Sequence, residues 1–294
     1  MAGPMAPPAP PKVPPAPTNG PVATTAATTA AAVKKPTRLA RRAIGNRIVL
    51  IGVEGVGKTS LVACAPNPLI VMAGNETGYE TLMNNHRVPE VDVLHAHRWT
   101  DLLASLEAVA ADTENAYDVI GLDAIGGIER LCHEHICETQ FNGVWGEKGF
   151  TGYQRGYDVS VTQWLRLLHI LDKMKERGTH VVFLSHCQVR PFKNPLGDDF
   201  DQYKADVHHK TWAATHRWSD AALFMNFLTD VQKVDGSAKK KGVGGTTRML
   251  YTERRDAFDA KNRFGMPEMI QLPDDPNQMW ATVDYYMTAN KKES

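Results

Sequence analysis

The segment Gly52-Val53-Glu54-Gly55-Val56-Gly57-Lys58-Thr59 is a full match to the pattern G-x-x-x-x-G-K-S/T. An apolar segment at 47–51 precedes it and predicts a short buried strand, and residues 58–65 follow it with the pattern of a helix. Glycines let the backbone wrap closely around a polyphosphate, so that successive N–H groups and the helix N-terminus face the anion. Because strand, loop and helix are all in place, we predict a nucleotide-binding phosphate loop rather than a glycine-rich turn without a ligand.

The residue types in this loop have distinct expected roles. The Lys58 ammonium is expected to reach the β- and γ-phosphates, and the Thr59 hydroxyl to ligate Mg²⁺. We therefore predict ATP and Mg²⁺ as cofactors; no Asn-Lys-x-Asp motif, which reads guanine, is found in the sequence. The loop residues expected to contact the nucleotide are Gly52, Glu54, Gly55, Val56, Gly57, Lys58, Thr59 and Ser60.

An acidic residue ends a second apolar segment, Tyr117–Asp123, in the manner of a Walker B element. A carboxylate at the carboxyl end of a strand beside the phosphate loop can hold Mg²⁺, so Asp123 is predicted as a second metal residue. The alternative is an aspartate that only caps the next helix. Since Ala124 follows instead of glutamate, the residue that orients the attacking water is expected elsewhere.

Glu76 is the candidate for that role, because it follows the predicted strand at 69–73. Its alternative is a glutamate in the first turn of a surface helix capped by Asn75. A third strand, at 180–185, ends in Ser185 and His186, which are predicted to sense the γ-phosphate; a purely structural Ser-His pair is the alternative.

Composition and charge narrow the class of protein to which the chain can belong. The 294 residues carry 33 basic and 33 acidic side chains, so the formal net charge of zero gives no global attraction to nucleic acid or membrane. No apolar segment approaches membrane-spanning length, no secretory signal is recognised, and four cysteines fit reduced thiols. Residues 1–42 form a Pro/Ala/Thr-rich segment predicted to be disordered, 43–288 a single ATPase domain, and 289–294 a disordered C-terminus.

Strand and helix patterns alternate along the domain, which predicts an α/β fold with a mainly parallel sheet covered by helices on both faces. Towards the C-terminus the segments 246–254 and 269–272 indicate hairpin or edge strands, and 278–287 a closing helix. The remaining predicted strands are 47–51, 69–73, 91–95, 119–123, 180–185 and 222–228, and the remaining helices are 58–65, 100–111, 125–141 and 159–177.

These motifs together resemble the RecA-like recombinase ATPase core, over roughly residues 45 to 285. The sequence is similar in particular to phage-encoded RecA-like ATPases of the single-strand annealing or recombination type. Two further segments carry the resemblance: Lys210–Leu223, which resembles that family's passage into its next strand, and Ala260–Pro267, which resembles its Lys-x-Arg-x-Gly segment.

The resemblance implies a RecA-like P-loop NTPase core with β-hairpin additions towards the C-terminus. It implies that Glu76 is the catalytic glutamate and that Lys261 and Arg263 act in trans on the nucleotide of a neighbouring subunit; a solvated basic turn is the alternative for the last two. It further implies a homo-oligomer, as a ring or filament, that acts in the cytoplasm of a phage's bacterial host. Its partners would be single-stranded DNA and, through the tails, a single-strand DNA-binding protein.

Two segments are expected to face DNA by the same resemblance. The first, 141–157, combines glycine, aromatic and basic residues, which suits stacking on bases and pairing with phosphates. Its alternative is a mobile loop whose aromatic side chains fold back onto the core. The second is a loop from Gln188 to Lys210, in which four aspartates weaken the electrostatic argument. The predicted DNA-binding residues are Trp145, Lys148, Phe150, Tyr153, Arg155, Tyr157, Arg190, Phe192 and Lys193.

Cys132-His133-Glu134-His135-Ile136-Cys137 contains residue types that bind metals. Helical spacing puts His133 and Cys137 on one face and Cys132 on another, and no second Cys/His pair lies nearby in sequence. A structural zinc ion normally needs four ligands, so metal binding is not our preferred interpretation of this segment.

The sequence therefore predicts a DNA-stimulated ATPase that binds single-stranded DNA and promotes annealing or strand exchange. A hexameric RecA-like helicase or motor shares the same core and remains an alternative. A small-molecule kinase would use the same loop, although no Arg-rich lid is evident. A DNA-binding module that does not hydrolyse ATP is the fourth possibility.

Overall fold

The computed structural model describes residues 44–114, 116–233 and 240–292, and the segment 1–43 lies outside these residues. The predicted N-terminal tail therefore falls outside the described residues. Contacts divide the chain into residues 1–41 and 42–294, and the second unit contains all of the described residues.

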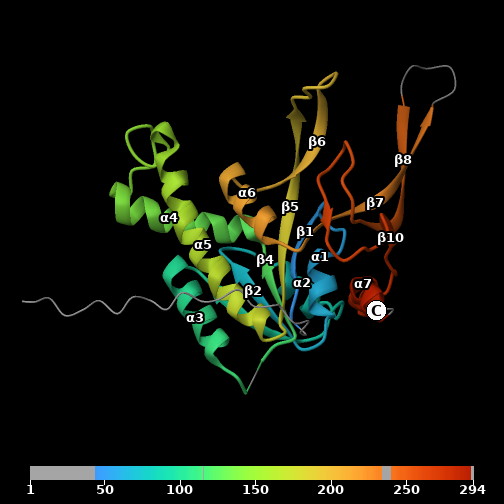
Figure 1. The fold of residues 1–294 in the computed structure, drawn as a ribbon, viewed down its shortest axis with the longest axis horizontal. Coiled ribbons are helices and arrows are strands. Elements are labelled where there is room, and N and C mark those ends of the chain that lie inside the picture. The colour runs from blue at the N-terminus through green and yellow to red at the C-terminus, as the bar shows by residue number, and fades with distance from the viewer. Residues whose placement is uncertain (1–43, 115, 234–239, 293–294) are drawn as a thin grey trace, which may run out of the picture. The chain divides into compact units, whose positions relative to one another are not determined.

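The central feature of this unit is a mainly parallel sheet with the strand order β10-β8-β7-β1-β5-β4-β2-β3 (Figure 1). Neighbours from β7 to β3 pair in parallel, whereas β8 and β10 add antiparallel strands at one edge. β6 pairs with β5, and β9 with β7. The strands are β1 (Arg47–Gly52), β2 (Pro68–Ala73), β3 (Asp92–Ala96), β4 (Val119–Asp123), β5 (His180–Phe192), β6 (Phe200–Ala205), β7 (Ala221–Lys233), β8 (Lys240–Tyr251), β9 (Lys261–Asn262) and β10 (Met269–Gln271).

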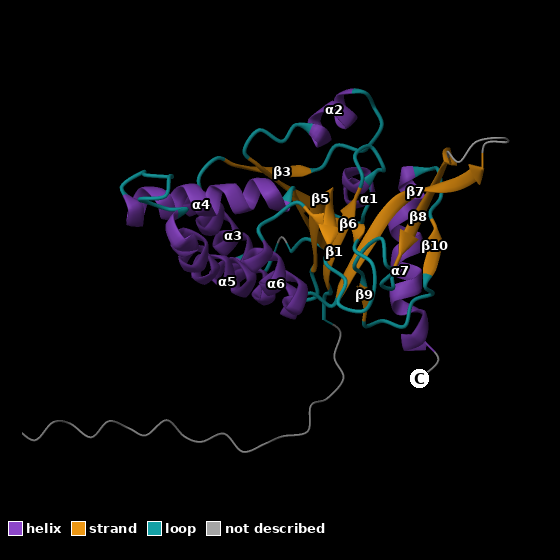
Figure 2. Cartoon of the chain, turned by 90° about the horizontal axis from the view of Figure 1, so that it is seen from above, coloured by secondary structure: helices purple, strands orange, loops and turns teal. Residues whose placement is uncertain are grey.

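Helices cover both faces of the sheet, as alternation along the buried strands requires. Val49 and Ile51 of β1 pack in the cluster with α3, α4 and α5, while Ile48 and Leu50 pack in the cluster with α1 and α7. Figure 2 shows α3, α4, α5 and α6 on one side of the sheet and α7 on the other. The helices are α1 (Lys58–Ala63), α2 (Gly78–Asn84), α3 (Trp99–Ala111), α4 (Ile125–Phe141), α5 (Arg155–Glu176), α6 (His209–Trp218) and α7 (Pro276–Lys292), with a 3₁₀ turn at Gly152–Gln154.

The strand register brings the predicted site to one edge of the sheet. Gly52 at the end of β1 lies beside His186 of β5, and Asp123 at the end of β4 lies beside Met72 of β2. Parallel strands present their carboxyl ends together, so the phosphate loop, Asp123, His186 and the segment after β2 meet there. The predicted α/β fold class, a mainly parallel sheet covered by helices on both faces, is confirmed.

Several predicted boundaries are wrong. The expected loop from Gln188 to Lys210 is a β-hairpin: β5 continues past the sheet to Phe192 and pairs with β6, and α6 begins at His209. This hairpin extends away from the sheet in Figure 1. At the other end, α7 continues through Lys292, where a disordered C-terminus was expected from residue 289. Helices α2 and α6 were not predicted.

None of the helices in the described part of the chain is long and apolar enough to cross a membrane. All four cysteines are free thiols, with Cys132 and Cys137 buried.

Helix α1 approaches β4 closely enough to require glycine at one position. A Cβ atom on Gly121 would lie 2.4 Å from Cγ1 of Val62, well inside van der Waals contact. Val62 is β-branched and fully buried, so it has little freedom to move aside. The close approach positions α1, and with it the phosphate loop, against the sheet.

We expect Gly121→Ala to lower the free energy of unfolding by about 1–3 kcal/mol through overpacking. The same substitution in a Val62→Ala background should cost less, because the shortened side chain makes room, and urea denaturation of the double-mutant cycle measures this coupling. Gly146→Ala, where a Cβ meets nothing within 4 Å, is the control and should stay within about 0.5 kcal/mol of wild type. Purely additive effects of the two core substitutions would contradict this explanation.

Candidate functional site

The phosphate loop takes the conformation that its glycines allow. Gly55 and Gly57 have φ values of 71° and 102°, in the left-handed region that favours glycine. Lys58, which opens α1, is only 7% exposed, and its Nζ donates hydrogen bonds to the carbonyl oxygens of Gly52 (2.8 Å) and Val53 (2.9 Å). Burial lowers the pKa of Lys58, because removal from water disfavours its charged form.

Thr59 and Asp123 form the second part of the site. The Thr59 hydroxyl donates a hydrogen bond of 2.7 Å to Oδ2 of Asp123, across from α1 to the end of β4. Asp123 is buried, and burial raises the pKa of its carboxyl while the bond from Thr59 opposes that rise. The peptide bond that follows, between Asp123 and Ala124, is cis.

This pair fits a magnesium ion. A hydroxyl and a carboxylate are hard oxygen ligands, and Mg²⁺ is usually held by one or two carboxylates together with waters and substrate phosphates. Among the described residues no group of three or more His, Cys, Asp or Glu side chains could form an all-protein metal cage. Thr59 and Asp123 are therefore the residues that would hold Mg²⁺ with a nucleotide.

Glu76 follows β2 and pairs with His186, which ends the part of β5 that lies in the main sheet. Their Oε2 and Nε2 atoms are 3.9 Å apart. The interaction with His186 lowers the pKa of Glu76, and the same interaction raises the pKa of His186. Glu76 precedes α2, which begins at Gly78, so it does not lie in a first helical turn capped by Asn75.

One pocket of about 440 Å³ joins these groups. This volume lies in the range of small-molecule and cofactor sites. Its walls come from the phosphate loop, β4, β5, the α2 region and the C-terminal segment. It is lined by Gly55, Gly57, Lys58, Thr59, Ser60, Glu76, Gly78, Thr81, Leu82, Arg87, Asp123, His186, Arg248, Asp274, Pro276 and Met279.

Three charged residues of this pocket were missed from the sequence: Arg87, Arg248 and Asp274. Arg248 lies on β8 and its Nε donates a 3.0 Å hydrogen bond to the Val56 carbonyl of the phosphate loop. No local motif marks any of the three, because tertiary folding alone brings them to the loop.

Other predicted nucleotide residues lie outside the pocket lining. Glu54 is exposed, whereas Gly52 and Val56 are buried. Ser185 is fully buried, and its hydroxyl donates to the His186 carbonyl at 2.8 Å. The structure thus brings His186 to the nucleotide pocket and leaves Ser185 in the core.

Lys261 and Arg263 do not line the pocket. Lys261, on β9, donates from Nζ to the carbonyl oxygens of His216 and Ser219 at the end of α6, the latter at 2.6 Å. Arg263 is half-exposed and lies 3.5 Å from Asp220, just before β7 begins. Their position is away from the chain's own phosphate loop, and the contacts of Lys261 favour a structural role for that residue.

The predicted DNA segment at 141–157 divides into exposed and buried aromatic side chains. Tyr153 is 96% exposed and Trp145 45% exposed, whereas Phe150 is fully buried, which is incompatible with stacking on a base. Tyr157 is half-buried and stacks on His208 with ring centroids 4.0 Å apart. Phe150 and Tyr157 therefore fold back onto the core, which was the alternative interpretation of this segment. Lys148 and Arg155 are exposed.

The β5–β6 hairpin carries the other predicted DNA residues. Arg190 is exposed, and Lys193 is exposed but paired with Asp199 at 2.6 Å. Phe192 contacts Phe200 across the hairpin, and the Lys204 ammonium lies 5.2 Å from the centre of its ring. Phe192 thus stabilises the hairpin itself.

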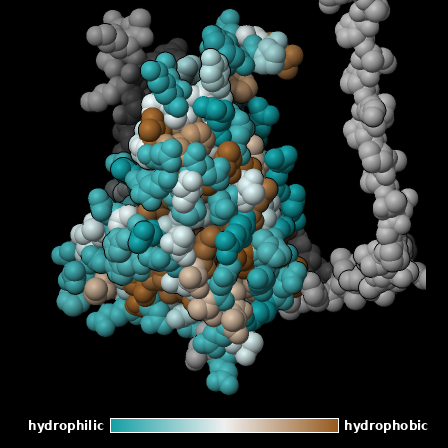
Figure 3. All heavy atoms as spheres, turned by 90° about the vertical axis from the view of Figure 1, so that its left-hand side faces the viewer, coloured by the Kyte–Doolittle hydropathy of each residue, from teal (hydrophilic) through white to brown (hydrophobic). Residues whose placement is uncertain are grey.

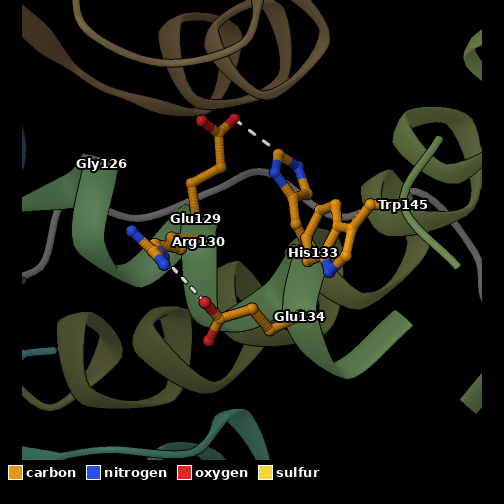
Figure 4. A pocket seen from close by; sticks show the side chains of 6 residues that line it. All are labelled: Gly126, Glu129, Arg130, His133, Glu134 and Trp145. Carbon is orange, nitrogen blue, oxygen red and sulfur yellow. Dashed lines mark hydrogen bonds and ion pairs between the residues drawn. The ribbon is translucent and has the colours of Figure 1, made fainter. Parts of the chain in front are cut away.

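The Cys132–Cys137 segment borders a separate pocket of about 340 Å³, shown in Figure 4. Glu129 points to His133 and Arg130 to Glu134, and Trp145 lies beside them. Burial lowers the pKa of His133 to about 4, so this imidazole is neutral at pH 7. Both Glu129 oxygens accept the His208 N–H that precedes α6, at 3.0 Å. These groups hold α4 against α6 and assemble no metal site among the described residues.

Comparison with known proteins gives three results. The sequence matches the family described as AAA domain over residues 44–264. No curated protein matches the chain. Among solved structures it is similar to a KaiC-like protein of the hyperthermophilic archaeon Pyrococcus horikoshii, with 11% identity, coverage of 80% of this chain and 88% of that chain, and a TM-score of 0.40.

The Glu76–His186 pair makes a testable prediction about titration. In His186→Gln the pKa of Glu76 should rise, since the largest lowering influence is removed while burial remains, and in Glu76→Gln the pKa of His186 should fall. NMR titration of the two side chains measures both shifts. Because the His186 pKa is raised and the Glu76 pKa is lowered in the folded protein, any stability from the pair is fully present between about pH 4.5 and 6.5. It is lost as the pH rises through the raised His186 pKa or falls through the lowered Glu76 pKa. Unchanged pKa values in both variants would contradict the pairing.

Proposed function

Because this chain belongs to the AAA domain family of P-loop ATPases, we propose that it hydrolyses ATP in response to single-stranded DNA and promotes annealing or strand exchange. The observation that carries the ATPase part is the convergence of Lys58, Thr59, Asp123 and Glu76 in one pocket. The DNA part rests on exposed residues of the β5–β6 hairpin and of the segment 141–157.

The side chains in the pocket have complementary tasks in hydrolysis. The Lys58 ammonium neutralises charge on the transferred phosphoryl group, and the loop N–H groups hold the phosphates in place. Glu76, whose pKa is lowered, is ionised at neutral pH and orients the attacking water, accepting its proton as the bond to phosphorus forms. When bound by Thr59 and Asp123, Mg²⁺ supplies further neutralisation of the phosphate charge.

Two exposed segments support contact with single-stranded DNA. Strand β5 runs without interruption from His186, in the pocket lining, into the exposed hairpin that bears Arg190 and Lys193. The loop before α5 exposes Trp145 and Tyr153 together with two basic side chains, a combination suited to stacking and phosphate contact. Figure 3 views the side of the molecule on which α4 lies in Figure 1 and shows a mostly hydrophilic surface with scattered apolar residues.

The proposal also covers the oligomeric state of the protein and the cell in which it acts. A ring or filament of identical subunits would allow Arg263, which is exposed and distant from its own phosphate loop, to reach a neighbouring nucleotide. We place this activity in the cytoplasm of a bacterial host, as part of a phage recombination system. Contact of the tails with a single-strand DNA-binding protein belongs to the same proposal.

ATP turnover tests the enzymatic part. We expect Glu76→Gln to reduce kcat by about 10²- to 10⁴-fold while ATP binding persists, because a general base acts on the chemical step. Lys58→Ala should lose binding as well. Phosphate release with and without single-stranded DNA, followed by an annealing assay, measures the effects. Turnover that ignores DNA, together with phosphoryl transfer to a metabolite, would indicate a kinase instead, and processive duplex unwinding would indicate a helicase.

DNA binding is tested at the exposed aromatic residues. Tyr153→Ala should weaken binding of an oligothymidine about tenfold, since each base–aromatic stack contributes roughly 1–3 kcal/mol. Lys148→Ala should reduce the salt dependence of binding by about one unit of log–log slope. Tyr285→Ala is the matched control, because Tyr285 is an exposed tyrosine on α7 that we do not place at the DNA surface. Equal affinities of the Tyr153 and Tyr285 variants, measured by fluorescence anisotropy, would count against this surface.

A further inference from the structure

We propose that Arg248 is a positioning residue of the nucleotide site, which orients a phosphate-binding amide of the loop from the C-terminal half of the chain. This inference rests on the proposed function, in that the site must bind a nucleoside triphosphate. It concerns a residue outside the motifs that identify such sites, on the antiparallel strand β8.

The backbone of Arg248 is fixed on both sides. Arg248 lies opposite Phe227 of β7 in the antiparallel ladder, and its carbonyl accepts the Leu272 N–H at 2.9 Å. Its side chain is 23% exposed and reaches across to the phosphate loop, where Nε donates to the Val56 carbonyl at 3.0 Å. The other end of the guanidinium lies 3.6 Å from the exposed Asp274 carboxylate. The arginine is thus anchored to the sheet and aimed at one carbonyl.

Because the peptide unit is planar, the contact with the Val56 carbonyl also sets the direction of the next N–H group. In a trans peptide the C=O and the following N–H point in opposite directions. A Val56 carbonyl held by Arg248 therefore fixes the direction of the Gly57 N–H, in the loop whose amides cradle the phosphates. Without Arg248 the unit would be freer to rotate, since Gly57 tolerates many conformations.

The arginine also lies beside Gly57. A Cβ atom on Gly57 would lie 3.5 Å from Arg248 Nε and 3.5 Å from Cε of Met279, which is ordinary van der Waals contact. The guanidinium therefore lies about one methyl group away from the Gly57 backbone, beside the buried Met279 of α7. Because a hydrogen bond from a charged donor is stronger than a neutral one, arginine holds the peptide more firmly than a neutral side chain would.

A positioning role has a characteristic kinetic consequence. The amides of the loop bind the α- and β-phosphates, which ATP, ADP and the transition state share. Loss of Arg248 should therefore weaken the binding of all three nearly equally, which raises KM and leaves kcat nearly unchanged. A residue that acted only on the γ-phosphate in the transition state would lower kcat and spare ADP.

The test compares Arg248→Met and Arg248→Lys with wild type and with Arg255→Met in the full-length protein. Arg255 pairs with Glu268 at 2.6 Å and lies outside the nucleotide pocket lining, so it controls for loss of an arginine. Calorimetry with Mg-ATP and with Mg-ADP gives Kd, phosphate release gives kcat and KM, and thermal unfolding confirms that each variant is folded.

We expect Arg248→Met to raise Kd about tenfold for both ATP and ADP, equivalent to about 1.4 kcal/mol. The value of kcat should stay within about threefold, and Arg248→Lys should recover part of the affinity. Wild-type affinity for both nucleotides in a folded Arg248→Met protein would overturn the inference, as would a loss confined to kcat. If Arg248→Met fails to fold, the same comparison is made with Arg248→Lys, for which unchanged Kd values overturn the inference. A wild-type protein that binds neither nucleotide would instead overturn the proposed function.

Discussion

The nucleotide pocket depends on the parallel pairing of four strands. β1 pairs with β5, and β4 pairs with both β5 and β2, so that the carboxyl ends of all four strands lie at one edge of the sheet. The register places the end of β1 beside His186 and the end of β4 beside Met72, within reach of the segment that carries Glu76. The close contact of Gly121 with Val62 then fixes α1, which carries Lys58 and Thr59, against this edge. Backbone pairing between strands therefore brings together residues, such as Gly52 and His186, that are more than a hundred positions apart in the sequence.

Burial disfavours the charged forms of two groups in the pocket. Removal from water raises the pKa of Asp123 and lowers that of Lys58, so each charged form is disfavoured by its surroundings. A bound nucleotide with its cation would oppose both effects, since phosphate favours the charged ammonium and Mg²⁺ favours the carboxylate. Disfavoured charges of this kind are typical of a site arranged for a charged ligand.

The parts of this protein that could be predicted from sequence are those governed by local pattern. The phosphate loop, Asp123 and the order of strand and helix follow from glycine spacing and apolar periodicity. Arg248 was not predicted as a site residue, because its partner Val56 is 192 positions away in the sequence, in the loop between β1 and α1. The hairpin of β5 and β6 was mistaken for a loop, because polar residues after His186 mask the continuing extended backbone. Burial of Phe150 depends on α4 and α5 packing together, which composition of the loop does not reveal.

Strand β5 is supported in two different ways along its length. Its first part, from His180 to His186, is clamped between β1 and β4, whereas its last part, from Cys187 to Phe192, pairs with β6. Mechanically this is a cantilever whose root lies in the nucleotide pocket. With about 3.3 Å per residue, the part of β5 from Cys187 to Phe192 spans roughly 20 Å. Its partner strand is braced in turn, because the Tyr203 N–H donates to the Ala257 carbonyl at 2.7 Å and the Gln202 amide to the Asp256 carbonyl at 3.1 Å. Any tilt of β5 at His186 is therefore shared with the segment that precedes β9 before it reaches the tip of the hairpin.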